Sequence, residues 1–407
     1  MKILGISAYY HDSAAALIIN NKIICAVQEE RFTRVKHDPN FPYYSIKYCL
    51  KSNGLSLNEI DYFVFYDKPF TKFERIFETY LHFAPRGFKS FYKSLPIWAK
   101  DKLFQKKLLI NELKKIDDKP DIKINLLFSN HHLSHASSAF FPSPFNNAAI
   151  LTMDGVGEWS TTSISIGLKN DISVIKEINF PHSIGLLYSA FTYYLGFKVN
   201  SGEYKLMGLA PYGKPEYVNR IKENLIDIKE DGSFKINIDY FDYCTGLKMT
   251  NNKFNKLFGS LPRDPETLIT QFHMDLAASI QKVTEDIVLK IAINIKKETG
   301  ENNLCLAGGV ALNCVINGIL ERKKIFKKIW IQPASGDAGG SLGAALCVRH
   351  MHQNKKRKIN FNSDNMKGAF LGPHFNDEEI AHELNSCGAI FEKLTEKLLI
   401  EEVSNAL

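Results

Sequence analysis

Four residues of this sequence could together bind one metal ion. His131 and His135 stand in NHHLSHASSAFF, Asp154 stands in LTMDGVGEW, and Asp337 stands in PASGDAGGSLGAA. Histidines four residues apart lie on one face of a helix, where both imidazoles can ligate the same ion. The two carboxylates would complete a shell of nitrogen and oxygen ligands with open positions. Such a shell fits iron, zinc or manganese, so ligand type alone does not choose the metal.

Two glycine-rich turns, AGGVALN and SGDAGGS, suit a nucleotide. Each is expected to follow a strand and open a helix, where free backbone N–H groups favour a phosphate. The candidate nucleotide-binding residues are Gly308, Gly309, Asn313, Gly336, Gly339 and Gly340. A metal ion beside a nucleotide indicates group transfer through an activated intermediate. We also interpret Glu203, in GEYKLMGLAPYG, as a polar residue at the start of a loop that contacts substrate or adenosine.

The elements that must position these residues form a weak internal repeat. Residues 2–34 predict three strands joined by turns, and residues 148–181 predict the same arrangement. Helical segments and later strands follow each block. The sequence therefore predicts an α/β chain with the duplicated actin-like fold of hexokinase and Hsp70 (ASKHA), as two β-β-β-α-β-α-β halves around a cleft. Two unrelated α/β domains are the alternative on pattern alone.

The pattern predicts three regions along the chain. Residues 1–147 form the first actin-like subdomain, with a helical insertion at about 70–116, and residues 148–355 form the second. Residues 356–407 form a linker and the start of a further domain. Aromatic residues recur through the insertion at helical spacing, which favours a core stripe, with an acceptor-binding lid as the alternative. The clearest long helix covers residues 264–299.

Composition excludes several classes of protein. No run of 18 apolar residues is present, and polar residues interrupt the N-terminal apolar stretch, so neither a membrane span nor a signal peptide is predicted. Seven scattered cysteines are typical of reduced thiols in the cytoplasm. The net charge of +7 gathers partly in residues 100–123, but acidic residues and an apolar stripe there favour a solvated amphipathic helix. A nucleic-acid partner is therefore not expected.

The ordered motifs resemble one family. GISAYYHDSAAALI, EERFTRVKHD, HHLSHA, DGVGEW, GEYKLMGLAPYG, AGGVALN and SGDAGGSLGAA follow one another over residues 1–350. Together they resemble the NodU/CmcH-type O-carbamoyltransferases, which modify natural products. HHLSHA and AGGVALN also resemble the related tRNA threonylcarbamoyladenosine synthases. The family's transferase domain has the actin-like fold that the repeat predicts.

The resemblance implies a reaction and roles for residues. In this family a C-terminal YrdC-like domain makes carbamoyl-adenylate from carbamoyl phosphate and ATP, and an acceptor hydroxyl then takes the carbamoyl group. The resemblance implies that His131, His135, Asp154 and Asp337 bind Fe(II). It places His11 near the transferring group, as a proton acceptor or oxyanion partner. It places Lys36 where its charge could compensate phosphate. An ordinary structural histidine and a surface lysine are the alternatives.

The sequence departs from the family after residue 360. Two apolar-faced helices are expected there, and the arginine-rich glycine motifs of the YrdC-like domain are absent. We therefore expect either a truncated chain or one half of a split enzyme whose partner supplies carbamoyl-adenylate. Two other functions remain open. An actin-fold sugar kinase would need a DxGxT phosphate loop and Mg²⁺ held by oxygens. A non-catalytic remnant would bind nucleotide or metal without turnover.

Overall fold

Short apolar segments in the first 130 residues form a mixed five-stranded sheet. In the computed structural model, which describes residues 1–93, 95, 104–117 and 123–407, its strands are ordered β3-β2-β1-β4-β5. The strands are β1 (Lys2–Ser7), β2 (Ala14–Ile19), β3 (Lys22–Gln28), β4 (Tyr62–Phe65) and β5 (Leu126–Phe128). The first three pair antiparallel, whereas β4 lies parallel to β1 and β5 parallel to β4.

A second mixed sheet repeats this pairing. Its order is β12-β11-β6-β7-β8, with an antiparallel meander on one side of β6 and parallel strands on the other. Its strands are β6 (Asn147–Met153), β7 (Ser160–Leu168), β8 (Asp171–Asn179), β11 (Asn303–Ala307) and β12 (Lys328–Ile331). A short ribbon pairs β9 (Ile226–Ile228) with β10 (Phe234–Ile236). The chain is thus mixed α/β, with each predicted strand of the two blocks in place.

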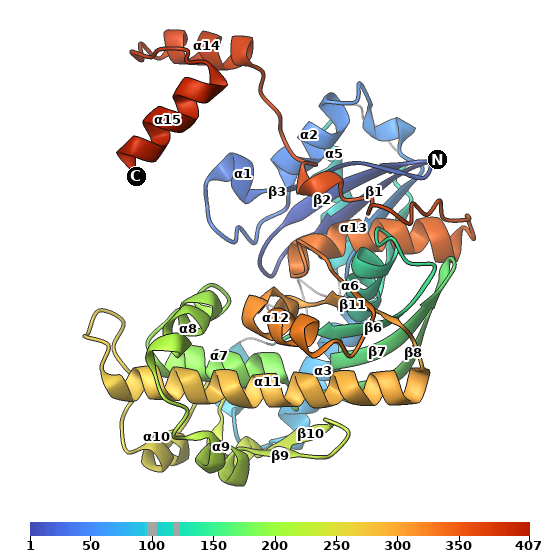
Figure 1. Cartoon of the computed structure of the whole chain (residues 1–407). Helices are drawn as coiled ribbons and strands as arrows, with labels where there is room; N and C mark the ends of the chain where they lie inside the picture. The colour runs from blue at the N-terminus through green and yellow to red at the C-terminus, as the bar shows by residue number, and fades with distance from the viewer. Residues whose placement is uncertain (94, 96–103, 118–122) are drawn as a thin grey trace. The chain divides into compact units, whose positions relative to one another are not determined.

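Two buried helices lie between the two sheets (Figure 1). Helix α13 (Asp337–Cys347) packs on β1 and β2, α6 (His131–Phe140) packs on β6 and β11, and the helices contact each other. Glycine permits this close approach. A Cβ at Gly343 would lie 1.7 Å from the carbonyl oxygen of Ser134, and a Cβ at Gly5 would lie 1.8 Å from that of Ser341. Small residues at these crossings bring the N-termini of both helices to one place.

The remaining helices pack on the sheets or on one another. They are α1 (Glu30–Thr33), α2 (Tyr43–Lys51), α3 (Pro69–His82), α5 (Gln105–Lys114), α7 (Ile184–Tyr194), α8 (Glu203–Leu209), α9 (Val218–Asn224), α10 (Asn252–Phe258), α11 (Gln271–Thr299) and α12 (Cys314–Lys323). The prediction for α11 was right about its end, where Gly300 adopts φ 68°. It was wrong about its start, because Thr270 and His273 form a capping box that begins the helix there.

The expected aromatic core of the 70–116 insertion is wrong for α3. Phe70 is 64% exposed and Phe77 is 39% exposed, whereas Lys72, Arg75 and Thr79 are buried. In α5, Leu113 of the expected stripe is buried and Leu108 and Ile110 are half-buried, whereas the buried Leu109 was not part of the prediction. Residues 94 and 96–103 of the insertion lie outside the described residues, as do residues 100–103 and 118–122 of the basic stretch.

The chain divides into a large unit, Met1–Leu371, and a small one, Gly372–Leu407. The small unit contains α14 (Asp377–Ser386) and α15 (Glu396–Ala406), the two helices expected near the end of the sequence. Neither buries a residue. All seven cysteines are free thiols. Within the described residues, no helix is both long enough and apolar enough to cross a membrane.

Candidate metal centre and substrate site

The four predicted metal ligands meet at the ends of elements from both halves of the chain. His131 begins α6, directly after its N-cap residue Asn130, and His135 follows one helical turn later. Asp154 comes directly after β6, and Asp337 is the first residue of α13. Because α6 and α13 cross between the sheets, residues far apart in sequence reach one point.

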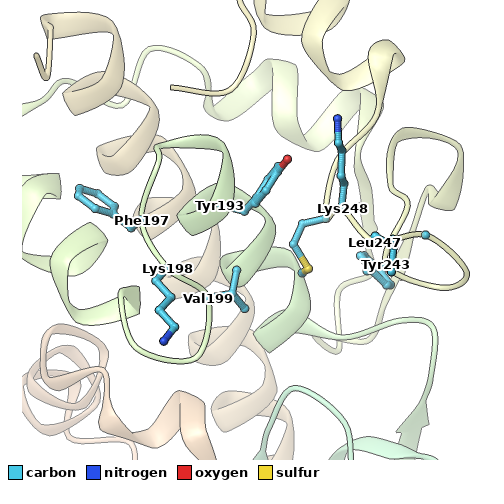
Figure 2. A pocket seen from close by; sticks show the side chains of 9 residues that line it. Tyr193, Phe197, Lys198, Val199, Tyr243, Leu247 and Lys248 are labelled. Atoms are coloured by element: carbon cyan, nitrogen blue, oxygen red, sulfur yellow. The ribbon is translucent and has the colours of Figure 1, made fainter. Parts of the chain in front are cut away.

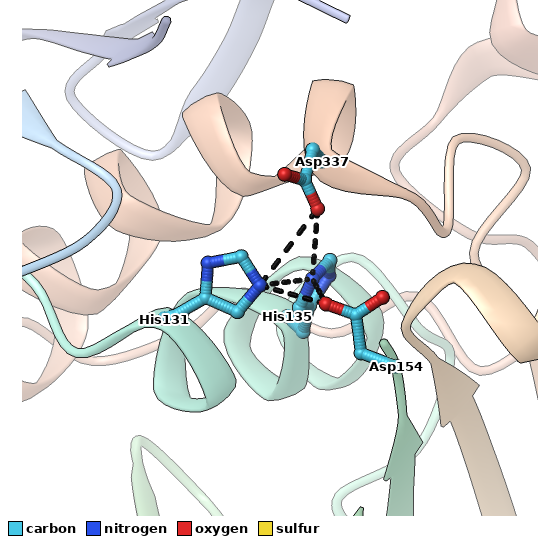
Figure 3. A group of neighbouring side chains, drawn as sticks. All are labelled: His131, His135, Asp154 and Asp337. Atoms are coloured by element: carbon cyan, nitrogen blue, oxygen red, sulfur yellow. Dashed lines mark hydrogen bonds and ion pairs between the residues drawn. The ribbon is translucent and has the colours of Figure 1, made fainter. Parts of the chain in front are cut away.

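The ligand atoms of these residues point toward one another (Figure 3). His131 Nε2 lies 2.9 Å from Asp154 Oδ2 and 3.7 Å from Asp337 Oδ1. His135 Nε2 lies 3.5 Å from the same oxygen of Asp154 and 3.6 Å from that of Asp337. The two Nε2 atoms are 3.1 Å apart. All four ligand atoms lie within 4.8 Å of one another.

The electrostatics of this cluster suit a cation. Desolvation opposes ionisation of Asp154 and Asp337, but His131 and His135 hold the pKa of Asp154 well below its ordinary value, and His11 and His131 lower that of Asp337. Burial lowers the pKa of His135, yet the two carboxylates raise it to about 10. The carboxylates are therefore ionised, and His135 holds a proton that must leave before Nε2 can ligate a metal ion.

The donor set fits a divalent transition metal. Two imidazole nitrogens and two carboxylate oxygens converge, without a sulfur ligand in the described cluster. Imidazole nitrogen with carboxylate oxygen suits zinc, iron or manganese. The neighbouring His132 is not among the four clustered residues, and its Nδ1 pairs with Ser163 Oγ at 2.9 Å. The arrangement is a candidate metal centre with four protein ligands.

Three groups outside the predicted ligand set hold these ligands in place. Glu158 is 3% exposed, and its carboxylate accepts the backbone N–H of His131 at 3.0 Å. Tyr66 donates its hydroxyl to Asp337 Oδ2 at 3.2 Å, and Gly309 donates its backbone N–H to the other oxygen of Asp154 at 3.3 Å. Glu158 belongs to the DGVGEW motif, and Tyr66 directly follows β4, but the sequence analysis gave neither residue a role.

His11 lies beside the metal centre. Its Nε2 is 3.8 Å from Asp337 Oδ2, and its Nδ1 is 2.8 Å from Asp12 Oδ2. The other carboxylate oxygen of Asp12, Oδ1, lies 2.7 Å from His37 Nδ1, so one carboxylate orients two imidazoles. Burial lowers the pKa of His11, but Asp337 and Asp12 outweigh that effect and raise it to about 9. Asp12 is a site residue that the sequence analysis missed, although it adjoins His11.

Lys36 and the GEYKLMGLAPYG motif meet at the surface. The Lys36 ammonium lies 4.9 Å from the centroid of the Tyr204 ring. The expected loop here is wrong, because α8 begins at Glu203. Its carboxylate accepts the backbone N–H of Asn200 at 3.0 Å and of Gly202 at 3.1 Å, which stabilises the start of the helix. Glu203 is thus engaged locally, and a contact with substrate stays a prediction.

The glycine turns divide into packed and open positions. A Cβ at Gly339 would lie 2.0 Å from the carbonyl oxygen of Ala334, and one at Gly340 would lie 2.6 Å from the Tyr66 ring. A Cβ at Gly308 would lie 2.1 Å from the backbone oxygen of Met153. These three glycines are needed for close packing inside the protein.

Two other predicted nucleotide positions face different surroundings. At Gly336, the N-cap of α13, an added Cβ would have no atom nearer than 3.8 Å. Asn313 caps α12 and exchanges hydrogen bonds with Gln281, at 2.9 and 3.2 Å. Gly336 therefore leaves room for a ligand, whereas the Asn313 side chain is occupied. A nucleotide at either position remains a prediction.

A pocket of about 420 Å³ lies elsewhere, lined by Tyr193, Phe197, Lys198, Val199, Tyr243, Gly246, Leu247, Lys248 and Met249 (Figure 2). These residues come from the end of α7, the following turn and the segment at 243–249. None of them is a metal ligand or a residue predicted for the site. The pocket is therefore separate from the candidate metal centre.

Comparison with known proteins identifies the family. Residues 2–346 match the family described as "Carbamoyltransferase N-terminus". An "Uncharacterized protein sll1178" of Synechocystis is 56% identical over 100% of this chain and 66% of its own length. "Nodulation protein NolNO" of Sinorhizobium fredii is 34% identical over 95% of this chain and 52% of its own length. The chain therefore belongs to the NodU-type carbamoyltransferases, as the motifs indicated, and spans about half to two thirds of these relatives.

Solved structures show more distant similarity. HypF of T. kodakarensis covers 87% of this chain and 48% of its own, at 14% identity and a TM-score of 0.41. (R)-2-hydroxyglutaryl-CoA dehydratase component A of Acidaminococcus fermentans covers 85% of this chain and 96% of its own, at 14% identity and a TM-score of 0.38.

Proposed function

We propose that this chain transfers a carbamoyl group from carbamoyl-adenylate to a hydroxyl of a small-molecule or natural-product acceptor. The hydroxyl oxygen bonds to the carbamoyl carbon, the bond from that carbon to the phosphate oxygen breaks, and AMP leaves. The hydroxyl proton passes to a base. The observation that carries the proposal is the cluster of His131, His135, Asp154 and Asp337 in a chain of this family.

These four residues would hold a divalent cation, and the family resemblance suggests Fe(II). When bound, such an ion supplies positive charge that stabilises negative charge developing on the carbamoyl group. The protein's contribution is to keep both carboxylates ionised and both imidazoles aimed at one point. Glu158 and Tyr66 support this role, because each bonds to a ligand residue without joining the shell.

His11 is proposed to act on the reacting atoms. A pKa of about 9 leaves it protonated at neutral pH, so it can donate a hydrogen bond to a developing oxyanion. A cation on Asp337 would offset the carboxylate that raises this pKa, and His11 could then accept the hydroxyl proton. Asp12 would orient the ring in either role. Lys36 is proposed to compensate phosphate charge.

We further propose that the two similarly paired sheets are the halves of a duplicated actin-like fold. Their shared strand order supports this. Residues 1–147 and 148–355 would be its subdomains, and 356–407 a linker to a YrdC-like domain. That domain, in one polypeptide or in trans, would supply carbamoyl-adenylate. Nucleotide contacts are proposed at Gly308, Gly309, Asn313, Gly336, Gly339, Gly340 and Glu203.

The test combines metal content with carbamoyl transfer. Anaerobically purified protein would receive synthetic carbamoyl-adenylate and a panel of hydroxylated acceptors, with AMP release as the readout. We expect metal-dependent release that His131→Ala abolishes. His132→Ala is the matched control, because His132 is equally buried on α6 but pairs with Ser163. Stoichiometric metal without AMP release, even after a YrdC-like domain is added, would favour a non-catalytic remnant.

A further inference from the structure

The buried face of α3 is polar and cationic. Lys72, Arg75 and Thr79 follow helical spacing and are 7%, 8% and 8% exposed. The aromatic residues of this helix lie on its other faces, half-buried or exposed. A helix at a protein surface normally turns its apolar stripe inward. The reversed arrangement indicates that two cations are needed at this interior position.

Lys72 has a partner for its charge. Its Nζ lies 2.9 Å from Oδ2 of Asp67 and 5.1 Å from the centroid of the Tyr10 ring. Because both charged groups are buried, their attraction offsets part of the cost of removing them from water. Lys72 and Asp67 therefore form an ion pair without net charge.

Arg75 has no such partner. Across the part of the chain that the structure describes, its guanidinium makes no hydrogen bond or ion pair, and its Cζ lies 5.2 Å from the centroid of the Phe180 ring. The nearby carboxylates are engaged elsewhere. Asp67 pairs with Lys72, and Glu158 accepts backbone N–H groups. The guanidinium is left with unused donors.

Arg75 keeps its positive charge although it is buried. Burial lowers the pKa of the guanidinium to about 10, while Glu158 and Asp67 act in the opposite direction. The group is therefore protonated at neutral pH. A buried cation without hydrogen-bond acceptors is costly, and an anion bound to its N–H donors removes much of that cost.

We infer that Arg75, beside Lys72, binds an oxyanion of a substrate, either a phosphate or a carboxylate. A guanidinium presents paired N–H donors that match two oxygens of such a group. Contacts connect this position to the metal centre. Tyr10 adjoins Lys72, its ring centroid is 4.5 Å from that of His11, and His11 Nε2 is 3.8 Å from Asp337.

The oxyanion has two possible sources. It is the phosphate of carbamoyl-adenylate, or it is an acid group on the acceptor. Assigning the anion to a substrate rests on the proposed function, but anion binding itself does not. Binding can be measured without turnover, so failure of the transferase assay and failure of this inference are distinguishable.

Thermal unfolding tests the site with inorganic phosphate and acetate as probes. The proteins are wild type, Arg75→Gln and Arg220→Gln. Arg220 is a charge-matched control, because it is exposed and donates to the Leu257 carbonyl oxygen at 3.3 Å. We expect at least one probe to raise the Tm of wild type and Arg220→Gln but not of Arg75→Gln. Without anion, Arg75→Gln should be at least as stable as wild type, because it removes an unpaired buried charge.

Two results would overturn the inference. One is that neither probe stabilises any of the proteins or that both stabilise all three equally. The other is that Arg75→Gln is less stable than wild type by the same amount with and without anion, which would show a structural role.

Calorimetric titration with AMP and adenosine then identifies the source. If the anion is the nucleotide phosphate, Arg75→Gln weakens AMP binding about 10-fold or more and leaves adenosine binding unchanged. AMP also displaces the inorganic anion. If the anion belongs to the acceptor, AMP binds all three proteins equally and the inorganic anion stays bound. Loss of AMP release with anion binding intact would count against the proposed transfer reaction alone.

Discussion

Helices α6 and α3 both turn polar side chains toward the interior, but only α6 has its charges balanced by the protein. On α6, His131 and His135 meet the carboxylates of Asp154 and Asp337. On α3, Lys72 meets Asp67, whereas Arg75 meets no acidic partner within hydrogen-bond distance in the described structure. The comparison shows that the proposed cation site on α6 contains its own carboxylates. The proposed anion site on α3 contains a guanidinium whose N–H donors remain available to a ligand.

The largest expected effect is loss of the metal from the α6 cluster. Replacing Asp337 with Asn removes the negative charge of one ligand, although the amide oxygen can still accept the Tyr66 hydroxyl. Metal affinity should fall by more than about 100-fold, because loss of groups outside the ligand shell already costs 10–100-fold. Metal analysis after dialysis measures this. A stoichiometric metal in Asp337→Asn would break the comparison, since the cluster would not need its own anions.

The next largest effect is a difference in stability between variants of the two cations of α3, Lys72 and Arg75. Lys72→Met leaves Asp67 buried without a partner, so the free energy of unfolding should fall by about 3–5 kcal/mol. Arg75→Gln should show no such loss. Urea unfolding compares the two variants. The double variant Lys72→Met with Asp67→Asn should recover most of the stability, and failure to recover it would show that Lys72 acts by packing instead.

The crossing of α6 and α13 should be nearly as sensitive. Gly343→Ala places a Cβ against the carbonyl oxygen of Ser134, and we expect a loss of about 3 kcal/mol in unfolding free energy. Gly336→Ala is the control, because its Cβ would make only an ordinary contact, 3.8 Å from Leu312 Cδ1, and should change stability by less than about 0.5 kcal/mol. Equal stability of the two variants would contradict the close helix crossing.

Glu158→Gln should have a smaller effect. It keeps an acceptor but loses the charge that strengthens the bonds to the N–H groups of Lys68 and His131. We expect a loss of about 1 kcal/mol in unfolding free energy and about 10-fold weaker metal binding. Urea unfolding and competition with a chelator measure the two quantities. Unchanged metal affinity would show that Glu158 supports the fold without orienting the ligands.

A pH dependence is expected at a buried histidine away from the cluster. Burial, with the charges of Arg357 and Arg349, lowers the pKa of His350 to about 4 from 6.5. Neutral His350 therefore stabilises the fold above pH 6.5, and this contribution is lost as the pH falls from 6.5 toward 4. His350→Phe should flatten the stability profile in that window. An identical profile in the variant would contradict the assignment.

Much of the fold and part of the site follow from local patterns. Apolar alternation located the strands of both blocks, and the four-residue spacing of His131 and His135 placed both imidazoles on one helical face. Local patterns failed where partners are distant. The aromatic spacing of α3 favoured an inward aromatic stripe, but its buried face carries Lys72 and Arg75. Lys72 contacts Asp67 and the Tyr10 ring, and Arg75 contacts the Phe180 ring. Glu158 stood in the DGVGEW motif and Tyr66 stood outside the motifs, and the partners of neither residue could be deduced from spacing.

By itself, the sequence determined the residue types, the strand periods and the family, because these depend on local order and on motifs read along the chain. Only the tertiary structure decided which polar groups meet. Asp154 and Asp337 reach the α6 histidines because glycine lets α13 cross α6 closely between two sheets. Among the described residues, Arg75 lies buried without an acidic partner, because Lys72 pairs with Asp67 and Glu158 accepts the backbone N–H groups of Lys68 and His131. Burial and pairing of charge are long-range properties, so they cannot be deduced from local periodicity.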